Sequence, residues 1–203
     1  MTRSCHICLL DDSPITALTP LLDPAIPSDR VIFAIHAHQQ GAVARLKAML
    51  APRGITVSSW LLPGTLKTAE LIDSYHALVD REISRNNDEQ LFFNASCGPR
   101  HHVLAAYEVA RAYQLHCYVI EPELDELCWL YPEEKTNANL ADRLKLKDFF
   151  TATDCHIKSI ANEGLVEKNI RDLGTLWLSR ASEIANALGQ LNWLAASARD
   201  RQL

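Results

Sequence analysis

The sequence predicts an α/β fold in which helices flank a mostly parallel sheet. Short apolar runs alternate with segments of helical periodicity over residues 5–120. The connections between these runs have the lengths of right-handed parallel crossovers. A chain of 203 residues that is 48% hydrophobic can bury one full core and a small appendage. A large second catalytic domain does not fit within this length.

The individual elements follow from the periodicity of the apolar residues. Strands are predicted at residues 5–10, 31–36, 55–62, 90–94 and 116–120. Helices are predicted directly after the first strand and at residues 39–50, 66–85 and 100–113. A turn and a further apolar run at 127–131 favour an antiparallel hairpin at the sheet edge. This order is typical of a Rossmann-like sheet.

Two parts of the chain are predicted. We expect a Rossmann-like domain over residues 1–135 and a small, partly helical C-terminal extension over 136–203, joined through the polar stretch 133–139. An amphipathic helix is expected from Ile170 onward. Its apolar stripe, which predicts a homodimer, comprises Trp177, Ile184, Leu188 and Leu191. The extension is expected to serve dimerisation or regulation.

Composition excludes several classes of protein. No apolar run reaches the roughly 18 residues that span a bilayer, and the N-terminus lacks a signal-peptide arrangement. We therefore expect a cytoplasmic protein without a membrane partner. The six cysteines lie mostly in apolar segments and are expected to be reduced packing residues. A net charge of −5 argues against a general DNA binder.

Neither a metal nor another cofactor is expected. Cys5 and Cys8 have zinc-like spacing, but an offset of three on a strand points the two thiols to opposite faces. His36 and His38 share a face only if their strand continues that far, and no third ligand lies near them in sequence.

The strongest functional signal is the segment 91–102, which reads as a buried strand, a small-residue turn and a cationic helix start. The free N–H groups and positive dipole end of the helix favour an anion at the carboxyl edge of the sheet. Arg100 adds a planar, bidentate phosphate donor. The alternative is an ordinary turn in which Asn94 and Ser96 cap the helix.

A second loop follows the first strand. Ser13 and Thr16 can offer hydroxyls to a phosphate or ribose, or can simply cap a helix. Cys97 suggests a different class of protein. A thiol at a helix N-terminus beside Arg100 and His101 is placed to have a lowered pKa, as a nucleophile requires. A Cys97-dependent thiol hydrolase or transferase is therefore an alternative, as is a tight turn that needs a small residue.

Together, the two loops resemble those of the CRISPR-associated Rossmann-fold (CARF) family, the sensors of cyclic oligoadenylate in type III CRISPR antiviral defence. The family's second loop commonly reads Asn-x-Thr-Gly-Gly-Thr-Lys, followed by an alanine-rich helix. This chain keeps Asn94, Gly98 and a terminal cation, Arg100, and departs from the pattern at Ser96, Cys97 and Pro99. The resemblance covers residues 5–131. Residues 144–164 loosely resemble what precedes a metal-dependent nuclease in one subgroup, but no matching acidic cluster follows.

The resemblance implies a homodimer that holds one cyclic oligoadenylate, most readily cyclic tetra-adenylate, across a shared cleft. The residues that would bind it are Asp12, Ser13, Thr16, Asn94, Ser96, Cys97, Gly98, Pro99, Arg100 and His101. Some family members also open the ring by metal-independent attack of a 2′-OH, for which Ser13, Arg100 and His101 would be the catalytic set. Of the adjacent His101 and His102, only one is expected to face the ligand. The alternative within the family is a non-catalytic sensor that regulates a partner or transcription.

Overall fold

The computed structural model describes residues 3–11, 14–24, 26–65, 67–85, 88–122, 124–141 and 143–154, together with Leu176, Ser179, Arg180 and Glu183. Its contacts divide the chain into two compact units, Met1–His156 and Ile157–Leu203. Most of the second unit, including the stripe that predicts dimerisation, lies outside the described residues. The proposed role of the C-terminal extension therefore stays a prediction.

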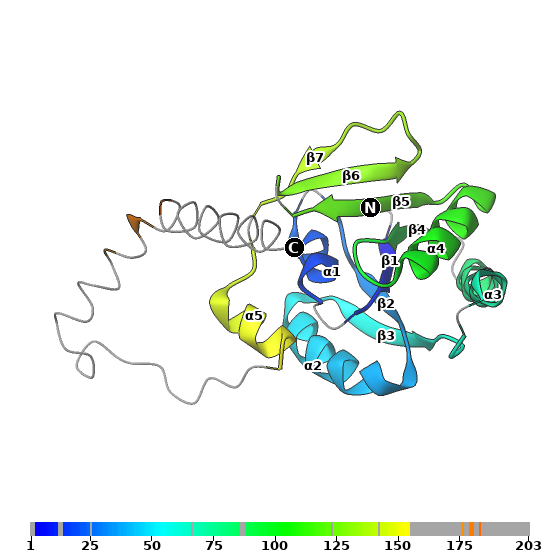
Figure 1. The fold of residues 1–203 in the computed structure, drawn as a ribbon, viewed down its shortest axis with the longest axis horizontal. Coiled ribbons are helices and arrows are strands. Elements are labelled where there is room, and N and C mark those ends of the chain that lie inside the picture. Colours follow the sequence, from blue (N-terminus) through cyan, green and yellow to red (C-terminus); the bar gives the residue numbers. More distant parts are fainter. Residues whose placement is uncertain are drawn as a thin grey trace, which may run out of the picture. The chain divides into compact units, whose positions relative to one another are not determined.

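One sheet organises the first unit (Figure 1). In the described part of the chain it has seven strands in the order β3-β2-β1-β4-β5-β6-β7. The strands are β1 (Arg3–Leu9), β2 (Arg30–Ile35), β3 (Thr56–Leu61), β4 (Glu89–Asn94), β5 (His116–Glu121), β6 (Glu126–Tyr131) and β7 (Ala138–Asn139). The first five in spatial order are parallel, and β6 and β7 add antiparallel edges. The predicted α/β class and edge hairpin are confirmed.

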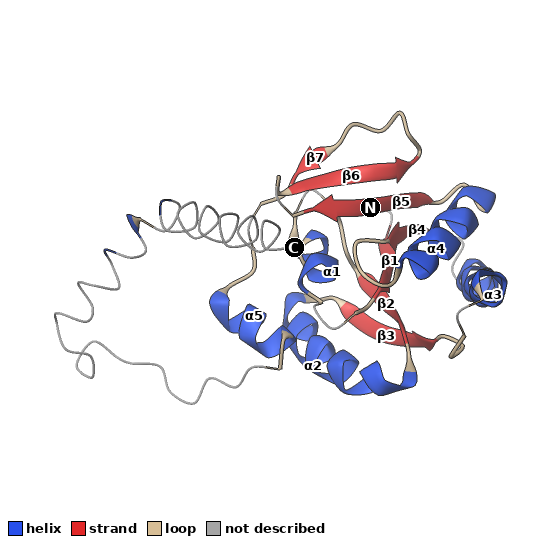
Figure 2. Cartoon of the chain, in the orientation of Figure 1, coloured by secondary structure: helices blue, strands red, loops and turns tan. Residues whose placement is uncertain are grey.

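Helices cover both faces of this sheet (Figure 2). They are α1 (Ile15–Leu18), α2 (Gln40–Leu50), α3 (Thr68–Arg85), α4 (Arg100–Ala112) and α5 (Leu146–Ala152), with short 3-10 turns η1 (Pro20–Leu22), η2 (Ala37–Gln39) and η3 (Ala51–Arg53). Apolar residues of α3 and α4 pack on one face, and those of α1, α2 and α5 on the other. No helix among the described residues is long and apolar enough to cross a bilayer.

Strand β1 shows how the period of two builds both cores. Cys5, Ile7 and Leu9 join the cluster beneath α3 and α4, whereas Cys8 joins the cluster beneath α1 and α2. The two thiols of the zinc-like pair therefore lie on opposite faces, as predicted. The five described cysteines, Cys5, Cys8, Cys97, Cys117 and Cys128, are free.

The structure adds two elements where the sequence predicts a linker and an unsettled segment. Ala138 and Asn139 pair with Leu127 and Glu126, so the polar stretch ends in a short edge strand, β7. Helix α5 contributes Ala152 to the cluster beneath α2. Both elements are grouped with the first unit.

Candidate anion site at the switch point of the sheet

The two loops that the sequence singles out meet at the carboxyl edge of the sheet. The chain runs from β1 outward through β2 and β3, and then returns to place β4 on the other side of β1. Open α/β sheets bind ligands where the strand order reverses in this way, beyond the carboxyl ends of the strands, which here are β1 and β4. The loop after β1 and the loop after β4 flank this switch point. Asp12 and Ser13 lie outside the described residues.

Gly98 sits at the tightest point of the second loop. Residues other than glycine rarely adopt its backbone φ of +95°. A Cβ placed there would lie 3.4 Å from Cβ of Leu9. Its N–H donates to Oδ2 of Asp11 at 3.2 Å, which joins this loop to the one after β1. Glycine is therefore favoured here by the backbone conformation.

Asn94 and Ser96 hold the loop rather than cap the helix. Nδ2 of Asn94 donates to the carbonyl of Ala17 at 3.0 Å, and its Oδ1 accepts from the amide and hydroxyl of Ser96. The Ser96 hydroxyl also accepts from the amide of Ile120. The N-cap of α4 is Pro99, without a side-chain hydrogen bond, so the capping alternative is wrong.

Asn94 is 0% exposed and bonded at both ends of its side chain, so it positions the loop. Its expected contact with a ligand stays a prediction.

Cys97 lacks the properties of a nucleophile. Its Sγ lies 2.8 Å from Oγ1 of Thr16, and only 4% of the residue is exposed. Burial raises the pKa of the Cys97 thiol to about 11, with the Thr16 hydrogen bond offsetting part of the effect. The predicted lowering of this pKa is wrong, because the helix end is outweighed by desolvation.

Arg100 directly follows the loop after β4. It is exposed and is the first residue of α4, directly after the exposed Pro99. Among the residues that the structure describes, none forms an ion pair or hydrogen bond with its guanidinium. This cation is therefore available to an anion at this edge of the sheet.

Four histidines surround the same helix start, and the sequence analysis placed only His101 among the site residues. After β2, His36 is the N-cap of η2 and His38 lies within η2, while His101 and His102 occupy the first turn of α4. Ring centroids lie 5.9 Å apart for His36 and His38, 5.0 Å for His36 and His102, and 4.6 Å for His101 and His102. We call this cluster the histidine quartet. His102 is buried and His101 is partly exposed, yet both rings belong to it.

Burial and mutual repulsion keep the inner imidazoles neutral. Burial, and to a lesser extent the neighbouring His101 and His36, lower the pKa of His102 to about 4. The pKa of His36 is lowered by burial and by His38 and His101. No group of three or more His, Cys, Asp or Glu residues in the described part of the chain is arranged to hold a metal.

Gln39 connects the quartet to the switch point. Its Nε2 donates to the carbonyl of Leu10 at 3.1 Å, and its Oε1 accepts from the amide of His36 at 2.8 Å. Three loops, those after β1, β2 and β4, are thereby held together at one edge of the sheet.

Comparison with solved structures supports the fold described above. No family model and no curated protein matches the sequence. Among solved structures, protein VC1899 from Vibrio cholerae is 32% identical over 98% of this chain and 51% of its own, with a TM-score of 0.72. Can2 from Sulfobacillus thermosulfidooxidans, solved in complex with cyclic tetra-adenylate, is 18% identical over 97% and 52%, with a TM-score of 0.62. The chain has the fold of the CARF family.

A third match extends over less of the chain. A type III CRISPR defence DNA nuclease activated by cyclic oligoadenylate is 14% identical over 75% of this chain and 23% of its own, with a TM-score of 0.59. The chain spans about half the length of VC1899 and Can2. The CARF-type fold is thus found within longer proteins.

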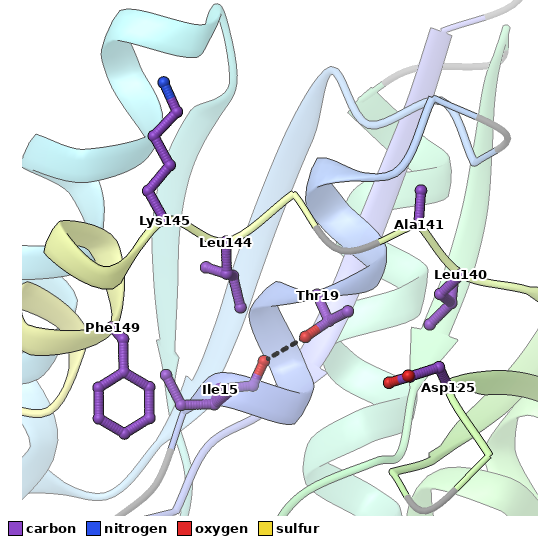
Figure 3. Close-up of a pocket in the computed structure, with 8 residues that line it drawn as sticks. All are labelled: Ile15, Thr19, Asp125, Leu140, Ala141, Leu144, Lys145 and Phe149. Atoms are coloured by element: carbon purple, nitrogen blue, oxygen red, sulfur yellow. Dashed lines mark hydrogen bonds between the residues drawn. The ribbon is translucent and has the colours of Figure 1, made fainter. Parts of the chain in front are cut away.

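The CARF-type domain also has a pocket beside α1 (Figure 3). It has a volume of about 420 Å³ and is lined by Ile15, Thr19, Asp125, Leu140, Ala141, Leu144, Lys145 and Phe149. Ile15 and Thr19 face this pocket, whereas Thr16 and Ala17 contact the loop after β4. Helix α1 therefore separates the pocket from that loop.

Proposed function

We propose that this protein binds cyclic oligoadenylate, most readily cyclic tetra-adenylate, at the switch point of its sheet and acts in type III CRISPR signalling. The observation that carries the proposal is the exposed guanidinium of Arg100 at the start of α4, beside the histidine quartet, in a CARF-type fold. That Can2 was solved with this ring supports the choice of ligand.

A symmetric pair of chains suits such a ligand. A ring of four phosphates carries four negative charges, and a two-fold axis doubles every donor that one protomer offers. Arg100 of each protomer would pair with a phosphate, and Gly98 would present backbone to the ring. Each charge-assisted contact is worth on the order of 1.5 to 3 kcal/mol. Asp12 and Ser13 in the loop after β1, and Thr16 on α1, would meet ribose or phosphate.

Ring opening is the second candidate function, and the partly exposed imidazole of His101 directly after Arg100 favours it. A neutral imidazole can accept the proton of a 2′-OH as that oxygen attacks the adjacent phosphorus. The P–O5′ bond then breaks, a 2′,3′-cyclic phosphate forms, and the departing O5′ takes up a proton. His101 is the more exposed imidazole on α4, and Arg100 would neutralise the charge that develops on the phosphate. Ser13 would orient the attacking group.

Incubation of the purified protein with labelled cyclic tetra-adenylate, with and without EDTA, tests both functions. We expect retention of the ring in a filter or gel assay, and EDTA-insensitive conversion to linear products ending in 2′,3′-cyclic phosphate. Binding without conversion would leave a sensor. Absence of binding at micromolar protein would remove the proposed function altogether.

A further inference from the structure

The histidine quartet brings four imidazole rings into contact beside the start of α4. Its four rings form a row in space, in which His38 contacts His36, His36 contacts His102, and His102 contacts His101. The charges that act on His36 come from His38 and His101, and those that act on His102 come from His101 and His36. Four close imidazoles repel one another when protonated, so the arrangement is stable only while most of them are neutral.

We propose that the histidine quartet is an anion contact that takes up protons as the ligand binds. The inference rests on the proposed function, because it takes the phosphates of a cyclic oligoadenylate as the anion. It assigns the inner residues His36 and His102, together with His38, to the ligand site. It also makes affinity depend on pH.

The sign of this dependence follows from the two states. In the free protein, burial and mutual repulsion hold the pKa of His36 and His102 below the ordinary histidine value. A phosphate brought against the rings favours their charged form and raises these pKa values. The complex then holds more protons than the free protein, so binding tightens as the pH falls. Uptake of about one proton corresponds to roughly tenfold in affinity per pH unit.

Asp11 in the loop after β1 and Arg100 at the start of α4 are charged groups at the switch point, and neither replaces this effect. Asp11 on the loop after β1 accepts the Gly98 amide. Arg100 on α4 remains a fixed cation across the relevant pH range and contributes no proton exchange.

Calorimetry with cyclic tetra-adenylate at pH 7.0 in two buffers of different ionisation enthalpy, PIPES and imidazole, measures proton uptake directly. Wild-type protein is expected to show a buffer-dependent enthalpy equivalent to at least half a proton per protomer. Affinity is expected to rise threefold to tenfold between pH 8 and pH 7. The double variant His36→Gln, His102→Gln should lose most of both effects.

Because His102 is buried, the double variant His38→Gln, His101→Gln provides a second test on more exposed rings. His76→Gln on α3, a histidine that contacts Tyr113 instead, is the matched control and should retain wild-type uptake. Tight binding with a buffer-independent enthalpy in wild type would overturn this inference and leave the proposed function intact. Full proton uptake in folded quartet variants would also overturn it. No binding in any protein would overturn both.

Discussion

The amide of Gly98 lies 3.2 Å from the carboxylate of Asp11, so an acidic side chain already engages a donor that a phosphate would use. The resemblance to CARF loops implies that the N–H groups near Gly98 cradle a phosphate. In the structure, Asp11 holds the loop after β4 in place and puts a negative charge beside the proposed anion site. A bound phosphate must share this amide with Asp11 or displace the carboxylate.

Asp11→Asn should therefore tighten binding of cyclic tetra-adenylate by roughly fivefold per site. Asparagine keeps an oxygen that accepts the Gly98 N–H, and it removes a repulsion of about 1 kcal/mol between charges some 4 Å apart in water. Calorimetry at constant salt measures the change. Weaker binding by the folded variant would show instead that the carboxylate helps to hold the ligand.

Cys97→Ser should leave binding, and any ring opening, within a few-fold of wild type. The serine hydroxyl can keep the hydrogen bond to Thr16, and burial has already placed the thiol pKa at about 11, too high for a thiolate at neutral pH. The labelled-ring assay on wild type and variant provides the comparison. Loss of product formation with binding retained would show that Cys97 takes part in the reaction and would support the thiol hydrolase or transferase alternative.

Acid should destabilise the domain between about pH 6.5 and 4. Nε2 of His6 lies 3.0 Å from the carbonyl of Pro27 and must donate to it, so Nδ1, at 2.8 Å, accepts from the Tyr118 hydroxyl. The contact with Tyr118 needs the neutral ring, because a protonated Nδ1 cannot accept a hydrogen bond. Burial lowers the pKa of His6 to about 4. The pKa of His102 is also lowered to about 4.

The unfolded chain therefore binds more protons in this range, and stability is fully present only above it. Each histidine contributes a loss on the order of 1 kcal/mol per pH unit. Thermal melting at pH 7.5, 6.0 and 5.0 should show a falling midpoint. A His102→Gln variant should lose less stability over this interval than wild type. A midpoint that stays constant down to pH 5.0 would contradict the assignment of neutral buried rings.

Dimerisation is expected from the apolar stripe of the C-terminal extension. Light scattering at micromolar concentration should give twice the monomer mass, and Leu188→Asp, within the stripe, should lower it. Leu104→Asp on α4 offers a control, because this exposed leucine belongs to the first unit. A monomer under these conditions would remove the shared cleft on which the ring-binding geometry depends.

Strands β1 to β6 were predictable because each has a local signature, whereas the two-residue β7 has none. In β1, alternating residues enter two different cores, and the Asn, Gly and Pro of the loop after β4 mark a turn before an alanine-rich helix. The contacts that residues make within the site could not be predicted from the sequence. Asn94 bonds to Ala17, and Ser96 to Ile120, partners that only the folded sheet brings near.

The histidine quartet shows the same limit. His36 and His38 are one residue apart just after a strand, and His101 and His102 lie in the first turn of a helix much later in the chain. Each pair alone suggests nothing beyond a surface or an incomplete metal site. Their contact depends on β1 lying between β2 and β4, a strand order that periodicity does not reveal. The raised pKa of Cys97 likewise arises from burial by distant segments.

The most direct test of the account is the affinity of Arg100→Ala for cyclic tetra-adenylate, measured by calorimetry beside Arg111→Ala, an exposed arginine in the last turn of the same helix. Loss of two charge-assisted contacts per dimer puts roughly 3 to 6 kcal/mol at stake, or about two to four decades in affinity. Arg111→Ala should bind as wild type does, and Arg100→Lys should recover only part of the loss, because a point charge cannot make the bidentate contact. Wild-type affinity in folded Arg100→Ala would contradict the account and remove the start of α4 from the binding site.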